Sequence, residues 1–131
     1  EPQASEESVG DALDVCAESW PVTSADAVVC INMIHIAPWE ATIGLMRGAA
    51  RVLRTGSPLC LYGPYRRDGR HTAPSNEAFD ATLRARDSAW GIRDLGDVAA
   101  CGLEHGLELA EVVAMPANNL TVVFMRVERR S

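Results

Sequence analysis

The stretch Ala27–Glu40 constrains the fold of this chain more than any other feature. It begins as an unbroken apolar run rich in β-branched residues, and it ends with two polar residues, Asn32 and His35, shortly before Pro38. A continuous apolar run is typical of a strand that is buried on both faces, as in a parallel sheet covered by helices. Ligands of open α/β sheets bind beyond the carboxyl ends of such strands. We therefore predict a strand over Ala27–Ile36 with a binding site at its end.

A helix and a second strand are predicted directly after this run. Pro38 suits the first turn of a helix, and apolar residues then recur at three- and four-residue intervals from Trp39 to Leu53. Gly56 is placed to end the helix, and residues 58–65 form another apolar run that closes with Gly-Pro-Tyr. A strand, a helix and a strand of these lengths predict a βαβ unit with two parallel strands.

Two further helices are predicted after a long polar loop. A cap at Ser75 or Asn76 opens the first, which runs to about Arg86. Asp94 is a good N-terminal cap for the second, and Gly106 is placed to end it.

The rest of the sequence predicts two strands, residues 107–115 and 120–127, joined by the four residues Pro-Ala-Asn-Asn. Strands joined by so short a turn must be antiparallel. The predicted fold class is therefore α/β, with a mixed, partial Rossmann-like sheet, about three helices and a C-terminal antiparallel hairpin.

Charge and hydropathy exclude several classes of protein. The net charge of −6 gives no electrostatic reason to bind nucleic-acid phosphates or an anionic membrane surface. No apolar run approaches the roughly 20 residues of a membrane span, and the first residues are acidic rather than signal-like. The four cysteines stand far apart, with no C-x-x-C or Cys/His spacing for a metal. We expect reduced thiols, no metal and a cytoplasmic location.

Five sequence blocks follow one another in this chain: Asn32–Trp39, Tyr62–Tyr65, Ser75–Asp80, Trp90–Asp94 and Met115–Leu120. In residues and in order, they resemble the signature blocks of one family, the methyltransferase-like protein 26 family, also called domain of unknown function 938. The resemblance implies a class I S-adenosylmethionine-dependent methyltransferase-like fold, of which this chain covers the C-terminal two-thirds.

One departure from the family concerns the cofactor. Family members begin with a strand and a Gly-rich turn that cradles the methionine part of S-adenosylmethionine, and no G-x-G-type turn opens a helix near the start of this sequence. We therefore expect a fragment or a truncated form, with residues 1–10 as a flexible lead-in and residues 11–131 as a single methyltransferase-like domain. Because the glycine-rich motif is absent, enzymatic activity stays open.

The resemblance also implies site residues. Asp14, Asn32 and Met33 would bind S-adenosylmethionine, the carboxylate of Asp14 accepting from the adenine amino group. His35 or Asp80 would act as a catalytic base where the methyl acceptor must lose a proton. The implied substrate-binding residues surround the middle of the chain and the hairpin turn: Tyr62, Tyr65, Ser75, Asn76, Trp90, Arg93, Asn118 and Asn119.

Structural roles compete with these functional ones. Asn32 could satisfy backbone groups at the strand end while His35 packs beneath a loop. Arg93 could clamp an anionic group or form an internal ion pair beside the cap at Asp94. Trp90 could pack in the core. The two asparagines at 118–119 suit a turn, because asparagine tolerates left-handed backbone conformations.

Two functions are compatible with this sequence. The first is an S-adenosylmethionine-dependent methyltransferase-like protein that lacks the N-terminal cofactor motif and has an unknown acceptor. The second is a non-catalytic homodimer, in which a second copy covers the exposed sheet edge at Ala27–Ile36 and the remaining pocket holds a small molecule.

Overall fold

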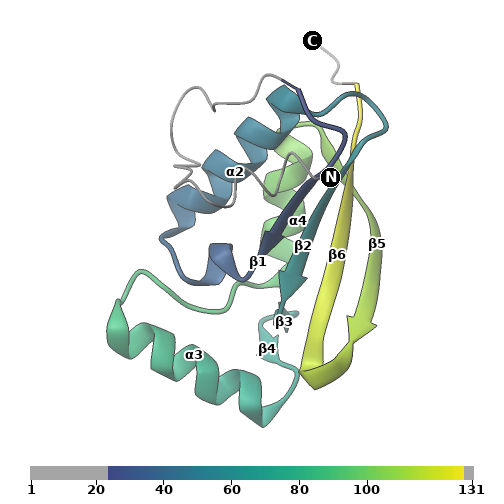
Figure 1. Cartoon of the computed structure of the whole chain (residues 1–131). Helices are drawn as coiled ribbons and strands as arrows, with labels where there is room; N and C mark the ends of the chain where they lie inside the picture. The colour runs from purple at the N-terminus through teal and green to yellow at the C-terminus, as the bar shows by residue number, and fades with distance from the viewer. Residues whose placement is uncertain (1–23, 129–131) are drawn as a thin grey trace.

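The computed structural model describes residues 24–128. Four strands form the main sheet in the spatial order β1-β2-β6-β5 (Figure 1). β1 is parallel to β2, and β6 is antiparallel to both β2 and β5. This arrangement confirms the predicted mixed α/β sheet with an antiparallel hairpin. The strands are β1 (Val28–Ile31), β2 (Pro58–Gly63), β5 (Leu107–Met115) and β6 (Asn119–Arg126).

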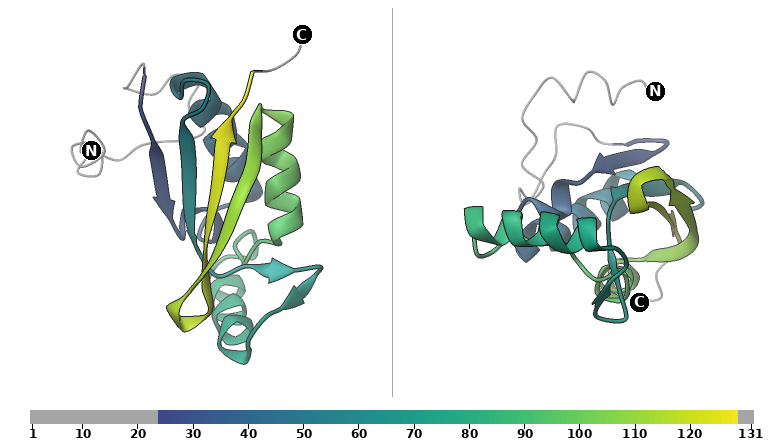
Figure 2. Two further views of the ribbon diagram at one scale, coloured as in Figure 1. Left: turned by 90° about the vertical axis from the view of Figure 1, so that its right-hand side faces the viewer. Right: turned by 90° about the horizontal axis from the view of Figure 1, so that it is seen from below.

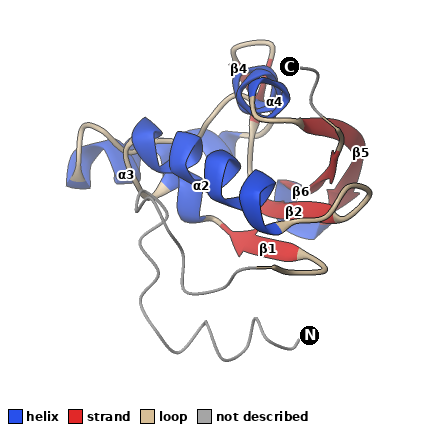
Figure 3. Ribbon diagram, turned by 90° about the horizontal axis from the view of Figure 1, so that it is seen from above, coloured by secondary structure: helices blue, strands red, loops and turns tan. Residues whose placement is uncertain are grey.

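The helices divide between one face of the sheet and its carboxyl end. α2 (Trp39–Val52) and α4 (Leu95–Glu104) lie on the same face (Figures 2 and 3), while α3 (Pro74–Arg86) lies beyond the carboxyl end of β2. Two short 3-10 helices, η1 (Met33–His35) and η2 (Pro116–Asn118), follow β1 and β5. The structure thus places irregular and helical segments beyond the carboxyl ends of the two parallel strands.

The core lies between the sheet and the two helices on its face. Along β2 and β6 the buried residues alternate with half-buried ones, so that Leu59, Leu61, Val122 and Phe124 point toward the helices. Helices α2 and α4 complete the cluster with Leu45, Met46, Ala49, Val52, Val98 and Cys101.

β1 ends earlier than predicted. The strand stops at Ile31, because Asn32 takes a left-handed backbone conformation with φ 60° and η1 begins directly after it. The apolar run nevertheless continues, since Ile34 turns back into the core with 3% of its surface exposed. Length and hydropathy do not separate a buried strand from a buried turn, so the prediction that the strand reaches Ile36 was wrong.

The start of α3 and the loop before it also differ from the predictions. The N-terminal cap of α3 is Ala73, with Pro74 as the first helical residue and no side-chain cap. Neither Ser75 nor Asn76 therefore caps the helix. The loop is not wholly irregular either, because β3 (Arg66–Arg67) pairs with β4 (Arg70–His71) in a small antiparallel hairpin.

Several local predictions are confirmed. Asp94 caps α4 by accepting a hydrogen bond from the Gly96 N–H at 2.9 Å. Gly106 follows α4 with φ 83°, a conformation that glycine adopts without strain. Within residues 24–128, no helix is both long and apolar enough to cross a membrane. The predicted lead-in over residues 1–10 and the predicted role of Asp14 lie outside the described residues.

Candidate functional site

The ends of β1 and β2 approach each other closely through Asn32 and Gly63. A Cβ atom on Gly63 would lie 2.5 Å from the Asn32 Oδ1, so this approach requires glycine. Oδ1 of Asn32 is buried and has no hydrogen-bond partner among residues 24–128. A buried acceptor without a partner costs stability, and it therefore marks a place where a ligand or water can bind.

His35 lies fully buried behind these strand ends, and its exposed fraction is 0%. The Arg93 N–H donates to His35 Nδ1 at 3.1 Å, so the neutral ring carries its proton on Nε2. Burial, reinforced by the positive charge of Arg93, lowers the pKa of His35 to about 4, although the Pro64 carbonyl opposes this shift. At neutral pH, His35 is consequently an uncharged donor whose ring packs edge-on against Tyr65, 5.0 Å between centroids.

A cavity of about 330 Å³ opens beyond these strand ends. We call it the amide pocket, because four asparagines and one serine supply its polar groups: Asn32, Ser75, Asn76, Asn118 and Asn119. Its other lining residues are Pro64, Phe79 and Ala117. The sequence predicted all five polar residues as site residues, and β1, α3 and the β5–β6 turn bring them to one place.

Hydrogen bonds hold the walls of the amide pocket together. Asn76 Nδ2 donates to Thr72 Oγ1 at 3.2 Å and to the Asn118 carbonyl at 3.4 Å, linking α3 to the hairpin turn. Asn119 Nδ2 donates to the Tyr62 hydroxyl at 3.3 Å. Asn118 has the left-handed backbone expected of an asparagine in this turn, with φ 63°, and Ala117 has the same φ, whereas Asn119 is extended with φ −95°.

Asp80 acts inside the protein rather than in the pocket. Its Oδ1 accepts from the Ile92 N–H at 2.7 Å, and its Oδ2 pairs with Arg84 Nε at 3.0 Å and with His71 Nε2 at 3.4 Å. Asp80 and Arg84 are four residues apart on α3, a spacing at which two side chains of a helix meet. Burial disfavours the charged form, but these partners outweigh it and lower the pKa of Asp80. Asp80 therefore ties α3 to the segment that follows it.

Arg93 is likewise committed to main-chain groups. Its Nε donates to the Ile34 carbonyl at 3.1 Å, and one terminal nitrogen donates to the carbonyls of Ala37 at 2.7 Å and Ala89 at 2.9 Å. The guanidinium also lies over the Trp39 ring, 5.7 Å from its centroid. Burial, with the nearby charges of Arg84 and Arg66, lowers the pKa of Arg93. Its contacts are those of a clamp on η1 and α2, distinct from the predicted contact with an anion or an ion pair with Asp94.

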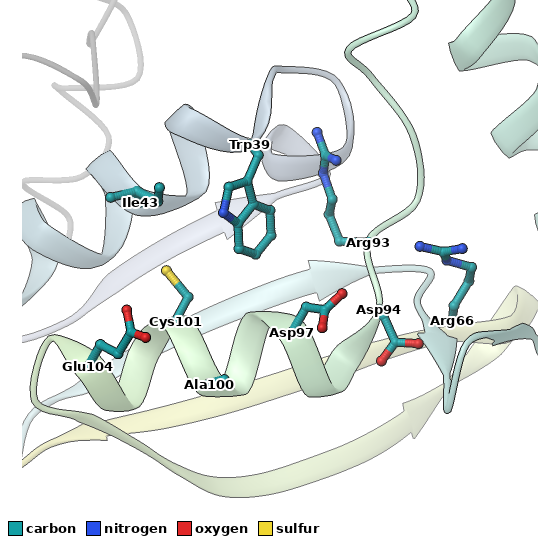
Figure 4. Close-up of a pocket in the computed structure, with 9 residues that line it drawn as sticks. All are labelled: Trp39, Ile43, Arg66, Arg93, Asp94, Asp97, Ala100, Cys101 and Glu104. Atoms are coloured by element: carbon teal, nitrogen blue, oxygen red, sulfur yellow. The ribbon is translucent and has the colours of Figure 1, made fainter.

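A second and larger hollow, about 470 Å³, lies along the groove between α2 and α4 (Figure 4). Arg93 and Trp39 line it, together with acidic residues of α4 such as Asp97 and Glu104. Asp94 is engaged there in capping α4 and in accepting from the Gly69 N–H. Arg93 and Asp94, which line this groove, already bond to main-chain groups. The groove shares no lining residue with the amide pocket at the strand ends. We therefore place the candidate site in the amide pocket.

The remaining predicted site residues occupy other positions. Tyr65 is 1% exposed, and burial raises the pKa of its hydroxyl. Met33 packs against the core from η1. Trp90 is half-buried in the segment between α3 and α4. Tyr62 reaches the site indirectly, through Asn119.

The sequence analysis assigned no role to four residues at the site. Pro64, Phe79 and Ala117 line the amide pocket, and Gly63 sets the approach of β1 and β2. The Gly-Pro pair that ends β2 was the available signal, because a glycine before a ligand site commonly permits close backbone approach.

Neither metals nor disulfides are part of the described site. Among residues 24–128, no three His, Cys, Asp or Glu side chains are placed to hold a metal ion. Cys30, Cys60 and Cys101 are free thiols, and burial raises the pKa of Cys30 to about 11.

The fold is similar to those of solved methyltransferase structures. CalO1, a methyltransferase in calicheamicin biosynthesis solved in its SAH-bound form, has a TM-score of 0.69 at 17% identity over 81% of this chain and 31% of its own. Human N-acetylserotonin methyltransferase in complex with SAM has a TM-score of 0.72 at 11% identity over 88% of this chain and 32% of its own. An O-methyltransferase family protein from Burkholderia thailandensis has a TM-score of 0.69 at 16% identity over 84% of this chain and 32% of its own.

The chain thus spans about a third of the length of these structures, and at such identities the likeness shows the fold. A family match is more extensive within this chain, because residues 7–126 match the family described as "Protein of unknown function (DUF938)". The chain belongs to the DUF938 family and has a methyltransferase-like α/β fold.

Proposed function

We propose that this chain is the acceptor-binding part of an S-adenosylmethionine-dependent methyltransferase of the methyltransferase-like protein 26 type. One observation carries the proposal: the unpartnered Asn32 Oδ1 lies at the carboxyl ends of parallel strands and lines a pocket formed by α3 and the hairpin turn. That edge is where open α/β sheets bind ligands. The structural neighbours solved with SAH or SAM support the choice of cofactor.

The described residues fit the cofactor at one point. The buried Asn32 Oδ1 needs a donor, and the ribose hydroxyls and the adenine amino group of S-adenosylmethionine are uncharged donors. Asp14 and Met33 are proposed to complete the cofactor contacts. When bound, S-adenosylmethionine supplies a methyl group activated by its sulfonium charge. The chain itself holds the acceptor beside Asn32, and such positioning supplies a large share of the rate of a two-substrate reaction.

The contacts of His35 and Asp80 support positioning roles in this reaction. A buried imidazole with a pKa of about 4 is a poor base at neutral pH, but its ring fills the space beside Gly63 and packs against Tyr65. Asp80 fixes Ile92, and Ile92 precedes the Arg93 N–H that sets the tautomer of His35. His35 and Asp80 therefore fix the positions of residues that adjoin the site, without contacting the substrate themselves.

Calorimetric titration of the chain with S-adenosylmethionine tests the proposal. We expect saturable heat, and a weaker response from Asn32→Gly, which removes the unpartnered amide while glycine keeps the φ of 60° without strain. Asp68→Gly is the matched control, because Asp68 also has a positive φ, 54°, and lies in the β3–β4 turn away from the site. If the unaltered chain gives no heat at millimolar cofactor, the proposal is wrong.

One observation favours a second candidate function, the non-catalytic homodimer. Val29 and Ile31 of β1 are 60% and 63% exposed, and β1 is the edge of the sheet. In register with them, Cys60 and Tyr62 of β2 extend the same apolar face. Within the described part of the chain, no helix lies on this face (Figure 3). The solution mass of the chain, measured by analytical ultracentrifugation, decides whether a second copy covers it.

A further inference from the structure

We infer that the amide pocket takes a neutral small molecule of one or two rings that carries an N–H or O–H group. This inference rests on the proposed function, because it names the chemical class of the methyl acceptor at the same site. Three properties of the pocket lead to it: its lack of charge, its unpartnered hydrogen-bond acceptor, and its size.

The first property is the absence of charge. None of the eight residues that the structure places around the pocket has a charged side chain. Two charged residues that the sequence predicted for the site are committed elsewhere. Asp80 bonds to Ile92 and Arg84, and Arg93 bonds to main-chain carbonyls. A charged ligand would lose hydration in this pocket without meeting an opposite charge, which is costly. A neutral ligand avoids that cost.

The second property is an unpartnered acceptor. Oδ1 of Asn32 lines the pocket, is buried and has no hydrogen-bond partner within residues 24–128. An amide oxygen has two lone pairs, so this atom can accept from the methyl acceptor as well as from the cofactor. The ligand therefore presents N–H or O–H groups, which are also the groups that a methyltransferase alkylates.

The third property is size and shape. The cavity of about 330 Å³ is near the lower end of the range for small-molecule pockets, roughly 300–1,000 Å³. Phe79 and Pro64 supply apolar surface beside the amides, and aromatic rings favour other flat rings. This volume suits one or two rings and excludes a folded macromolecule from the pocket itself.

A set of matched probes tests the inference without any cofactor. Benzamide, benzoate and benzamidine share one ring and differ in charge, and phenol differs from anisole by its O–H group. Titrated into the isotope-labelled chain, benzamide should shift the side-chain amide signals of Asn76, Asn118 and Asn119 in ¹H–¹⁵N spectra. Benzoate and benzamidine should bind about tenfold more weakly, equivalent to about 1.4 kcal/mol, and phenol should bind more tightly than anisole.

A single added charge should change this selectivity. Asn118 is exposed and its left-handed conformation is tolerated by aspartate, so Asn118→Asp should fold and should favour benzamidine over benzamide. Thr55→Asp adds the same charge at an exposed turn before β2, at the other end of the sheet, and should leave the order of the probes unchanged.

The outcomes separate this inference from the proposed function. Equal binding of benzoate or benzamidine to the unaltered chain overturns the inference, and so does the absence of shifts from every probe at millimolar concentration. Preference for benzamide without any response to S-adenosylmethionine keeps the neutral pocket but overturns the methyltransferase assignment. Heat on titration with S-adenosylmethionine, without selectivity among the probes, supports the methyltransferase assignment but overturns the neutral pocket.

Discussion

At the scale of single residues, His35 shows what the sequence could and could not reveal. Its position after a buried strand correctly indicated a place beside the strand ends. Its protonation state depends on the main chain of Arg93, 58 residues away, and on complete burial. Local sequence patterns carry no information about such distant partners, so the choice between a base and a buried donor required the structure.

Acid should destabilise the protein through His35. The pKa of His35 is lowered from 6.5 to about 4 on folding, so the stabilising effect of the neutral ring is full above pH 6.5 and is lost as the pH falls toward 4. The shift corresponds to roughly 3 kcal/mol. Urea unfolding between pH 7 and pH 4 should show this loss, and His35→Gln should flatten it. An unchanged slope in His35→Gln would contradict the assignment.

Asp80 provides an internal control for that experiment. Because the pKa of Asp80 is lowered on folding, its stabilising effect is present above its unfolded value of 3.8 and is lost only below it, as the pH falls through the folded pKa. Asp80→Asn should therefore change the free energy of unfolding below about pH 4. The pH dependence above that value, which we assign to His35, should stay the same.

Gly63 should be intolerant of a single methyl group. Gly63→Ala would place Cβ 2.5 Å from Asn32 Oδ1, and overpacking of this kind costs about 1–3 kcal/mol. Denaturant unfolding should show that loss. In the double variant with Asn32→Gly the obstructing atom is gone, so most of the loss should be recovered. Equal losses with and without Asn32 would place the strain elsewhere.

At the scale of elements, the sequence predicted helices and strands well where periodicity or capping was explicit. The hairpin, the βαβ unit and the cap at Asp94 follow from turn length, apolar spacing and side-chain chemistry. The failures lie where one conformation is set by contacts across the fold. The left-handed Asn32 ends β1 beside Gly63, and α3 begins at Pro74 without a side-chain cap.

The junction of η1, α2 and the segment after α3 should depend on Arg93. Its guanidinium reaches three carbonyls with a planar geometry that lysine does not reproduce. Arg93→Lys keeps the charge but loses hydrogen bonds to these carbonyls, at a cost of about 1–3 kcal/mol. Thermal unfolding measures this cost. Arg67→Lys, at an exposed position of β3, is the matched control, and equal behaviour of the two variants would exclude the clamp.

At the scale of the whole molecule, composition and order of elements gave the fold class, while the uncovered face of the sheet emerged from topology. Val29→Lys adds a charge to a side chain that is 60% exposed and should leave folding intact. If a second copy covers β1, this variant should be monomeric at concentrations where the unaltered chain is dimeric. A monomeric mass for the unaltered chain would remove the homodimer from consideration, whatever the variant does.

The spatial order β1-β2-β6-β5 has a consequence for the synthesis of the protein on the ribosome. β6 follows the other strands in sequence, yet it pairs with both β2 and β5. Until Asn119–Arg126 has left the exit tunnel, β2 and β5 have no strand between them, and two open edges are presented at once. A nascent chain stalled before β6 should therefore be recognised by chaperones and cleaved by proteases. Once the eight residues of β6 have left the tunnel, both the chaperone binding and the cleavage should stop.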